Sequence, residues 1–187
     1  ARVNKLLSES TAIIEAAYKE MAPNIGVVKE LSPLTKGKEF YAWQEANPAI
    51  DNAVNLLRKA GGSNNKMIVD AYDDFKSSRI IMTSIKDGKL SIDAVASYKK
   101  IDNVFEIKYL GSKGGTGAGT QILQQIAQQA RSEGAVIQAD ALMNARSYYE
   151  KLGMVQVEGW TNKYELAGDK LIKFADLSSG KGTDLLG

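Results

Sequence analysis

The 187-residue chain contains no cysteine and no histidine. These absences exclude thiol nucleophiles, disulfides, imidazole bases and the zinc or iron sites that need nitrogen or sulfur ligands. Serine–histidine–aspartate triads are excluded for the same reason. Acid–base chemistry would have to rely on carboxylates, lysine, tyrosine, main-chain groups or water. We predict no metal site.

The chain also lacks a strong charge of either sign and any long hydrophobic run. Its 24 Lys and Arg residues against 22 Asp and Glu give a net charge of +2, too balanced for a nucleic-acid binder held by bulk charge. No apolar stretch approaches the roughly 20 residues of a membrane span, and charge interrupts the first residues before any signal-length stretch. We expect a cytoplasmic protein with no membrane or nucleic-acid partner, or a virion location if a phage encodes it.

The first third of the sequence has helical character. Apolar residues between 5 and 21 fall close to helical spacing, and Pro23 ends that pattern. A second helix is predicted from Pro48, which follows a possible Asn47 cap, to the glycines at 61–62. We predict a helical arm over residues 1–62.

From residue 66 the hydrophobic period changes to two, which predicts strands. Short β-prone runs cover 67–72 and 79–85, and a hairpin turn at 86–89 leads into a strand over 90–98. Another alternating run follows at 104–110. The apolar residues predicted to share one face of the two longer strands are Leu90, Ile92, Ala94, Ala96 and Tyr98, then Phe105, Ile107 and Tyr109.

A different pattern follows this antiparallel meander. A glycine-rich loop precedes a helix over about 119–133, a strand at 135–139 and a helix over 142–152. Strand-like runs close the domain at 155–166 and 170–175. A strand, crossover helix and strand imply a parallel pair. We predict an α/β (α+β) domain over 63–177 with a mixed, mostly antiparallel sheet flanked by helices, followed by a tail over 178–187.

The loop from Gly111 to Thr120 reads GSKGGTGAGT. Its glycines allow main-chain N–H groups to converge at the start of a helix, where the helix dipole is positive. Such a loop can cradle an anion, with Lys113 as added charge. A merely flexible crossover turn is the alternative interpretation.

Two known phosphate-binding motifs can be compared with this loop, and neither matches it fully. A P-loop needs Gly-Lys followed by Ser or Thr, which is not present. A dinucleotide fingerprint would use Gly115 and Gly117 with Asp140 as the ribose-binding acid, but its third glycine falls at Thr120. Its position behind an antiparallel hairpin is also wrong for that fold. A dinucleotide-binding protein stays an alternative.

A third candidate for the loop agrees with more of the chain. The order of antiparallel strands, glycine loop, helix, strand, helix and closing hairpin, with the segment YYEKLGM at 148–154, resembles the GNAT family of acyl-CoA N-acyltransferases over residues 79–175. The resemblance implies transfer of an acetyl group from acetyl-CoA to an amine by direct attack, with no covalent enzyme intermediate and no metal.

The resemblance also implies roles for the loop. In the family, a Gln/Arg-x-x-Gly-x-Gly/Ala segment binds the pyrophosphate of acyl-CoA, and Gly117, Ala118 and Gly119 match its glycine half. Gly114 stands where the Gln or Arg belongs. Main-chain groups near 109–111 would hold pantetheine. The cofactor-binding residues expected on this basis are Tyr109, Leu110, Gly111, Lys113, Gly114, Gly115, Thr116, Gly117, Ala118, Gly119, Thr120 and Asn144.

The family helix A-x-x-x-Y-x-K-L-G-F is matched from Ala145 to Gly153, with methionine in place of the final aromatic. The match implies that Tyr149 is the general acid that protonates the departing thiolate. The family's pantetheine-binding Asn would be Leu142, and Asn144 lies nearby but out of register. An aromatic side chain that only packs the helix is the other interpretation of Tyr149.

The resemblance places a catalytic base at Glu106 on the strand over 104–110. A partly buried carboxylate there could have the raised pKa that a base requires. The alternative is a solvated glutamate beside Lys108, with the proton passing to water. Asp93 on the neighbouring strand is a weaker candidate.

The acceptor amine and the partners are less defined. The family builds its acceptor site from helices between the first two strands, but strands at 67–72 and from 79 leave no room for helices. Either the first strand is displaced or residues 1–60 rebuild the pocket. A rival hypothesis makes residues 1–62 and the tail surfaces for a protein partner or homo-oligomer, in a structural component such as a phage virion protein.

Overall fold

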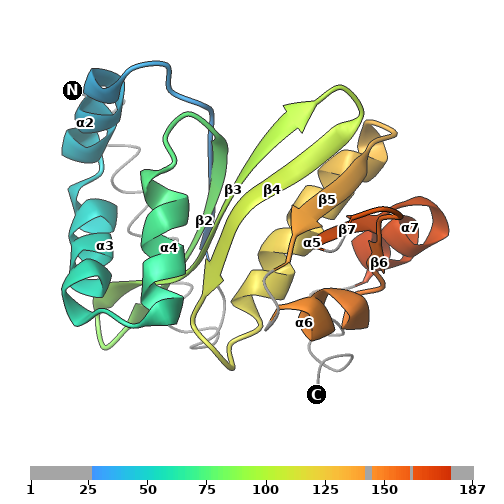
Figure 1. Cartoon of the computed structure of the whole chain (residues 1–187). Coiled ribbons are helices and arrows are strands. Elements are labelled where there is room, and N and C mark those ends of the chain that lie inside the picture. Colours follow the sequence, from blue (N-terminus) through green and yellow to red (C-terminus); the bar gives the residue numbers. More distant parts are fainter. Residues whose placement is uncertain (1–26, 142–144, 161, 178–187) are drawn as a thin grey trace.

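The computed structural model describes residues 27–141, 145–160 and 162–177. Within them one seven-stranded mixed sheet has the order β1-β2-β3-β4-β5-β7-β6 (Figure 1). The α/β fold class and the mostly antiparallel sheet are confirmed. The elements are β1 Val27–Leu31, α2 Gly37–Ala46, α3 Pro48–Ala60, α4 Ser63–Asp73, β2 Ser78–Lys86, β3 Lys89–Ile101, β4 Val104–Ser112, α5 Ala118–Ser132, β5 Val136–Asp140, α6 Arg146–Lys151, β6 Val155–Gln156, β7 Lys163–Leu166 and α7 Gly168–Asp176.

Two apolar cores form on opposite faces of the sheet. Helices α2, α3 and α4 cover one face through Phe40, Val54 and Ile68, on the left in Figure 1. Helices α5 and α7 pack on the other face through Ile126 and Phe174. Each helix buries one stripe and exposes the rest, as expected for surface helices.

The hairpin predicted at 86–89 is present. Asp87 and Gly88 have φ angles of 52° and 74°, and a two-residue turn with two positive φ angles matches the twist of antiparallel strands. The hairpin joins β2 to β3 with Lys86 paired to Lys89.

Two β-bulges change which side chains share a face. The β2–β3 register jumps from Met82–Ala94 to Thr83–Ile92, which leaves Asp93 as the extra residue. Because one extra residue reverses the alternation, Ile92 packs in the α2–α4 core whereas Ala94 packs in the α5 core. The prediction that Ile92 and Ala94 share a face was wrong.

The second bulge lies at Lys108. Strand β3 pairs Ser97 with Tyr109 and Tyr98 with Ile107. Phe105 and Ile107 lie in the α5 core, but beyond the bulge the alternation reverses and Tyr109 is 40% exposed. Tyr109 therefore does not share their face, contrary to the sequence prediction.

Two segments predicted as strands are helices. Residues 67–72 belong to α4 and residues 170–175 to α7. In α4 the buried side chains are Ile68, Val69, Ala71 and Tyr72, a spacing that places them on one side of a helix. Among the residues from 27 onward that the structure describes, the first strand is β1, so three helices lie between the first two strands, where the GNAT resemblance implies them.

The predicted helix from Pro48 is α3, and the glycine loop leads into α5 as expected. The division at residue 62 stays a prediction, although α3 and α4 share a core with β2 and β3. The expected helix over 5–21 and the tail over 178–187 lie outside the described residues. None of the described helices is long and apolar enough to cross a bilayer.

Candidate functional site

The sheet opens between β4 and β5. These two strands form the predicted parallel pair, which begins at Val104–Val136 and ends at Ile107–Ala139. The bulge at Lys108 follows at once, and residues up to Ser112 continue to pair with β3. Beyond Ile107, the edge of β4 that faces β5 thus has no strand partner among the described residues.

The glycine loop lies at the end of this open edge, where β4 passes into α5. Gly115 and Gly117 have φ angles of 76° and 70°, a conformation that favours glycine. The Thr116 hydroxyl donates to the Lys113 carbonyl at 2.9 Å and accepts from the Ala118 amide at 3.3 Å. Thr116 therefore closes the loop on itself.

The next amides in the first turn of α5 are those of Gly119 and Thr120. The first N–H groups of a helix have no acceptor within the helix, and none of the described residues accepts a hydrogen bond from these two. A Cβ atom at Gly119 would lie 3.0 Å from the Ser112 Oγ. A glycine at this position keeps the helix start close to the end of β4.

Helix α4 contacts this region directly. A Cβ atom at Gly111 would lie 2.2 Å from the Ile68 nitrogen and 2.4 Å from the Met67 carbonyl carbon. Gly111 is therefore a point of close approach between β4 and α4. The Asn64 side-chain nitrogen, in the first turn of α4, lies 3.9 Å from a Cβ built at Gly114.

Lys113 is directed at β3. Its amide donates to the Asp93 carbonyl at 2.8 Å, and its ammonium donates to the Ser91 hydroxyl. Burial lowers the Lys113 pKa, against the opposing effect of the Asp93 carboxylate. Lys113 would have to leave Ser91 to contact an anion at the start of α5.

Tyr149 lies on α6 and is only 6% exposed. Its ring meets Tyr148 edge-on at 5.5 Å and stacks on Tyr164 at 6.5 Å. Burial, helped by Tyr148, raises the Tyr149 pKa to about 12, so its hydroxyl stays protonated near neutral pH.

Tyr148 contacts the start of α5. Its hydroxyl lies 3.0 Å from the Thr120 hydroxyl and 3.8 Å from a Cβ built at Gly119. Burial raises the Tyr148 pKa, and the Thr120 hydrogen bond partly opposes this. Motif matching selected Tyr149 and missed Tyr148, Ser112 and Asn64, because nothing in the spacing indicates which neighbours reach the loop.

The two candidate bases lie on different strands. Glu106 is 25% exposed at its side chain and accepts from the Lys108 ammonium at 2.7 Å. It lies in β4 beside Gln138 of β5, within the last paired residues before the opening. Asp93, at the other bulge, is 3.9 Å from the Lys86 ammonium.

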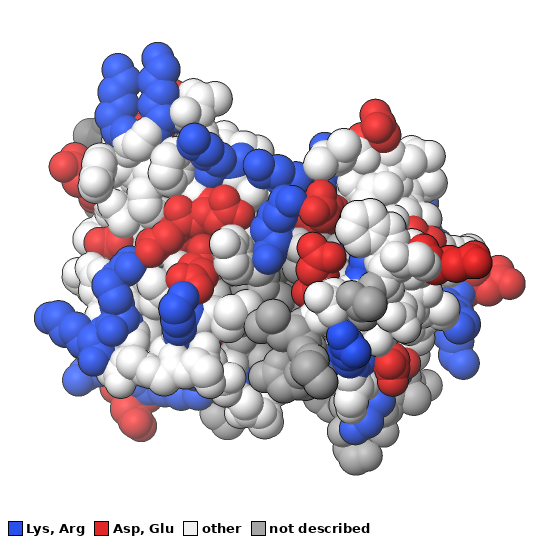
Figure 2. All heavy atoms as spheres, viewed as in Figure 1, with Lys and Arg blue, Asp and Glu red and all other residues white. Residues whose placement is uncertain are grey.

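The described surface is mixed in charge. Figure 2 shows basic and acidic side chains interspersed over the face in view. Asn144 and Leu142 lie outside the described residues, and no group of three acidic side chains in the described part is arranged to hold a metal ion.

Solved structures similar to this chain include several acyl- and acetyltransferases. A cAMP-binding acyltransferase from Mycobacterium smegmatis is 17% identical, with a TM-score of 0.40 over 58% of this chain and 35% of that protein. An acetyltransferase from an Exiguobacterium species is 12% identical, with a TM-score of 0.46 over 82% and 99% of the two chains. A Bacillus subtilis N-acetyltransferase solved with coenzyme A is 14% identical, with a TM-score of 0.42 over 78% and 98%.

No protein-family model matches the chain, and no curated protein matches it in sequence.

Proposed function

We propose that this protein is an acyl-CoA-dependent N-acyltransferase that moves an acetyl group from acetyl-CoA to an amine. One observation carries the proposal: the open edge of β4 beyond Ile107 leads directly to a helix start with two amides that have no described acceptor. An open strand edge and a helix N-terminus side by side suit a ligand with amide groups at one end and a diphosphate at the other.

The diphosphate would bind at the start of α5. The amides of Gly119 and Thr120 would donate to its oxygens, and the positive end of the helix dipole would favour its charge. Gly114 offers no side chain in place of the family's Gln or Arg. Asn64, which approaches Gly114 from α4, is a neutral donor able to take part of that role.

The pantetheine arm would run along the open edge of β4. Its amides can pair with main-chain groups of residues 108–112 as a short added strand would. A main-chain amide there would also polarise the thioester carbonyl, stabilising the oxyanion that forms when the amine attacks. The new C–N bond forms as the C–S bond breaks.

Two proton transfers complete the reaction. Glu106, or a water molecule beside it, would take the proton released by the attacking amine. A protonated tyrosine would return a proton to the departing CoA thiolate. Tyr149 is the residue that the family motif indicates, and Tyr148 is the tyrosine whose hydroxyl contacts the start of α5.

The binding half of the proposal is tested by thermal melting with acetyl-CoA, CoA and NAD. A ligand that binds only the folded state at a hundred times its Kd stabilises it by about 2.7 kcal/mol. We expect acetyl-CoA and CoA, but not NAD, to raise the melting temperature. Gly119→Val should lose the response, because its side chain would fill the space beside Ser112. Gly37→Ala, a glycine with open space around it, should keep the response.

Unchanged melting with acetyl-CoA would overturn the proposal, and a shift with NAD alone would favour the dinucleotide alternative. The catalytic half is tested by thiol release with a panel of amines. Tyr149→Phe and Tyr148→Phe should separate the two tyrosines, because only the variant that lacks the acid should lose turnover while keeping its acetyl-CoA shift.

A further inference from the structure

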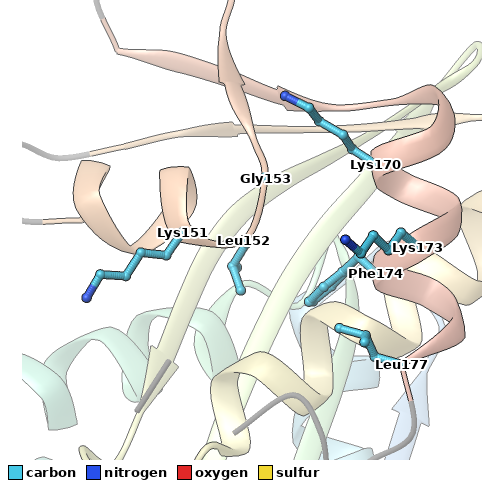
Figure 3. A pocket seen from close by; sticks show the side chains of 7 residues that line it. All are labelled: Lys151, Leu152, Gly153, Lys170, Lys173, Phe174 and Leu177. Carbon is cyan, nitrogen blue, oxygen red and sulfur yellow. The ribbon is translucent and has the colours of Figure 1, made fainter. Parts of the chain in front are cut away.

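A cavity lies between α6 and α7, away from the glycine loop. It has a volume of about 280 Å³ and is lined by Lys151, Leu152, Gly153, Lys170, Lys173, Phe174 and Leu177. In Figure 3 the side chains of Leu152, Phe174 and Leu177 reach toward the same space. None of these residues belongs to the glycine loop at 111–120, although Lys151, Leu152 and Gly153 belong to the motif that begins at Ala145.

The charged residues around this cavity are all lysines. Lys170 and Lys173 lie three residues apart on α7, a spacing that places them on one side of the helix and makes their charges repel. In Figure 3 the Lys173 ammonium is directed toward the space between α6 and α7, whereas the ammonium groups of Lys151 and Lys170 point away from it. Lys151 therefore contributes mainly its carbon chain to the wall.

These lysines differ from others in the protein. Lys66, Lys100 and Lys108 each form an ion pair with a carboxylate. Within the described ranges, no carboxylate pairs with Lys170 or Lys173, and none of the seven lining residues is acidic. The cavity thus combines an apolar interior with uncompensated positive charge at its edge.

Gly153 shapes this edge. Its φ angle is 92°, and a Cβ atom there would lie 3.9 Å from both Cβ and Cδ of Lys170. The carbon chain of Lys170 therefore lies against the backbone where α6 passes into β6. This contact holds the stem of Lys170 at the cavity while leaving its ammonium exposed.

We propose that this cavity binds a small molecule with an apolar chain and a terminal carboxylate. The chain would lie among Leu152, Phe174 and Leu177, and the carboxylate would pair with Lys173, toward which the exposed Lys170 side chain can turn. The anion would compensate the positive charge at the edge of the cavity, and the chain would bury apolar surface. This inference is independent of the proposed acyltransferase activity.

The size of the cavity limits the ligand. Small-molecule sites usually span about 300–1,000 Å³, so a volume of about 280 Å³ suits a short chain better than a long-chain fatty acid. Octanoate is a suitable probe. Octanol has the same chain without the charge, and acetate has the charge without the chain.

Calorimetric titration of the full chain tests the proposal. We expect octanoate to bind, and octanol and acetate to bind at least about tenfold more weakly, since one charge-assisted contact corresponds to roughly that factor. The double variant Lys170→Gln, Lys173→Gln should also bind octanoate about tenfold more weakly. Lys89→Gln, which removes an exposed lysine in the β2–β3 hairpin, should bind it as the parent does.

Three results would overturn the proposal. One is the absence of octanoate binding, and another is equal binding of octanoate by the parent and the double variant. The third is a parallel loss of acetyl-CoA affinity in the double variant, which would make the cavity part of the acyl-CoA site. Because the substituted side chains are exposed, the melting temperature without ligand should stay unchanged.

Discussion

The two faces of the sheet differ in how their buried polar side chains are paired. On the α5 face, two buried polar side chains of the helix have partners: Gln124 donates to main-chain carbonyls of α7 and its end, and Thr120 contacts Tyr148. Under α2–α4, Arg79 is fully buried, and two of its three guanidinium nitrogens find no acceptor among the described residues. The helix on one face thus pairs its buried polar side chains, whereas the other face holds a buried charge.

Aromatic rings take the place of a carboxylate around Arg79. Its guanidinium lies 5.2 Å from the ring of Phe40, 5.6 Å from Trp43 and 6.0 Å from Tyr72. The guanidinium donates a hydrogen bond to the Tyr72 carbonyl at 2.8 Å. Burial lowers the Arg79 pKa, while nearby Tyr72, Asp74 and Asp73 oppose the change. Cation–π contacts offset part of the cost of burying this charge.

The largest effect is expected at the contact between the α2–α4 layer and β4. Gly111→Ala would place a methyl group 2.2 Å from a main-chain nitrogen of α4, which no side-chain rotation can relieve. Since α4 would have to leave the sheet with several buried side chains, we expect a loss of about 5 kcal/mol or more in the free energy of unfolding. Urea denaturation measures it. Gly114→Ala, with no close neighbour, is the control, and equal stability of both variants would contradict the expectation.

On the opposite face, an ordinary cavity effect is expected. Ile126 is fully buried in the α5 core, so Ile126→Ala should lower the free energy of unfolding by about 2–5 kcal/mol. The same denaturation series measures it. A loss below about 1 kcal/mol would show that this core is not packed as tightly as described.

A smaller effect concerns alkaline stability. Burial raises the Tyr149 pKa to about 12, above its value of about 10 in an unfolded chain. The protonated Tyr149 hydroxyl therefore makes its full contribution to the free energy of unfolding below about pH 10. As the pH rises toward 12, this contribution of about 2–3 kcal/mol is lost. Denaturation between pH 8 and about pH 12 should show this fall, and Tyr149→Phe should reduce it. An identical pH dependence of parent and variant would refute the assignment.

The smallest change is expected at Arg79 itself. Because replacing a buried charge with an apolar side chain of similar volume is often neutral or favourable, Arg79→Met should change the free energy of unfolding by no more than about 1 kcal/mol. The contrast with Ile126→Ala tests whether the two faces differ as described. A loss as large as that of Ile126→Ala would show that the aromatic contacts of Arg79 contribute substantially to stability.

The second half of the fold was predictable because glycines mark the limits of its elements. Gly117 precedes α5, and Gly134, with a φ of 65°, follows it. In the first half, the sequence indicates the limits of helices and strands less clearly, and the sequence analysis did not predict β1 or α2. Residues 67–72 and 170–175 are short apolar runs whose β-branched and aromatic residues favour a strand, yet their buried positions also fit a helix, and packing on the sheet decides between them.

The candidate site was predictable only as a loop. The sequence placed the glycines at a helix start correctly, but the bulges at Asp93 and Lys108 depend on pairing between strands. Likewise, the approach of Asn64 and Tyr148 to the loop joins segments that are distant along the chain. The roles assigned to Tyr149, Glu106 and the loop residues stay predictions until binding and turnover are measured.

The contact at Gly111 has a consequence for sequence variation. Since α4 touches β4 there through main-chain atoms, the identity of the neighbouring α4 side chains does not set the distance between these elements. Natural or designed variants could exchange the exposed residues of α4 widely and keep the same spacing at the entrance to the glycine loop. Position 111 itself has no such freedom, and a search for distant homologues should give that single glycine more weight than the helix that covers it.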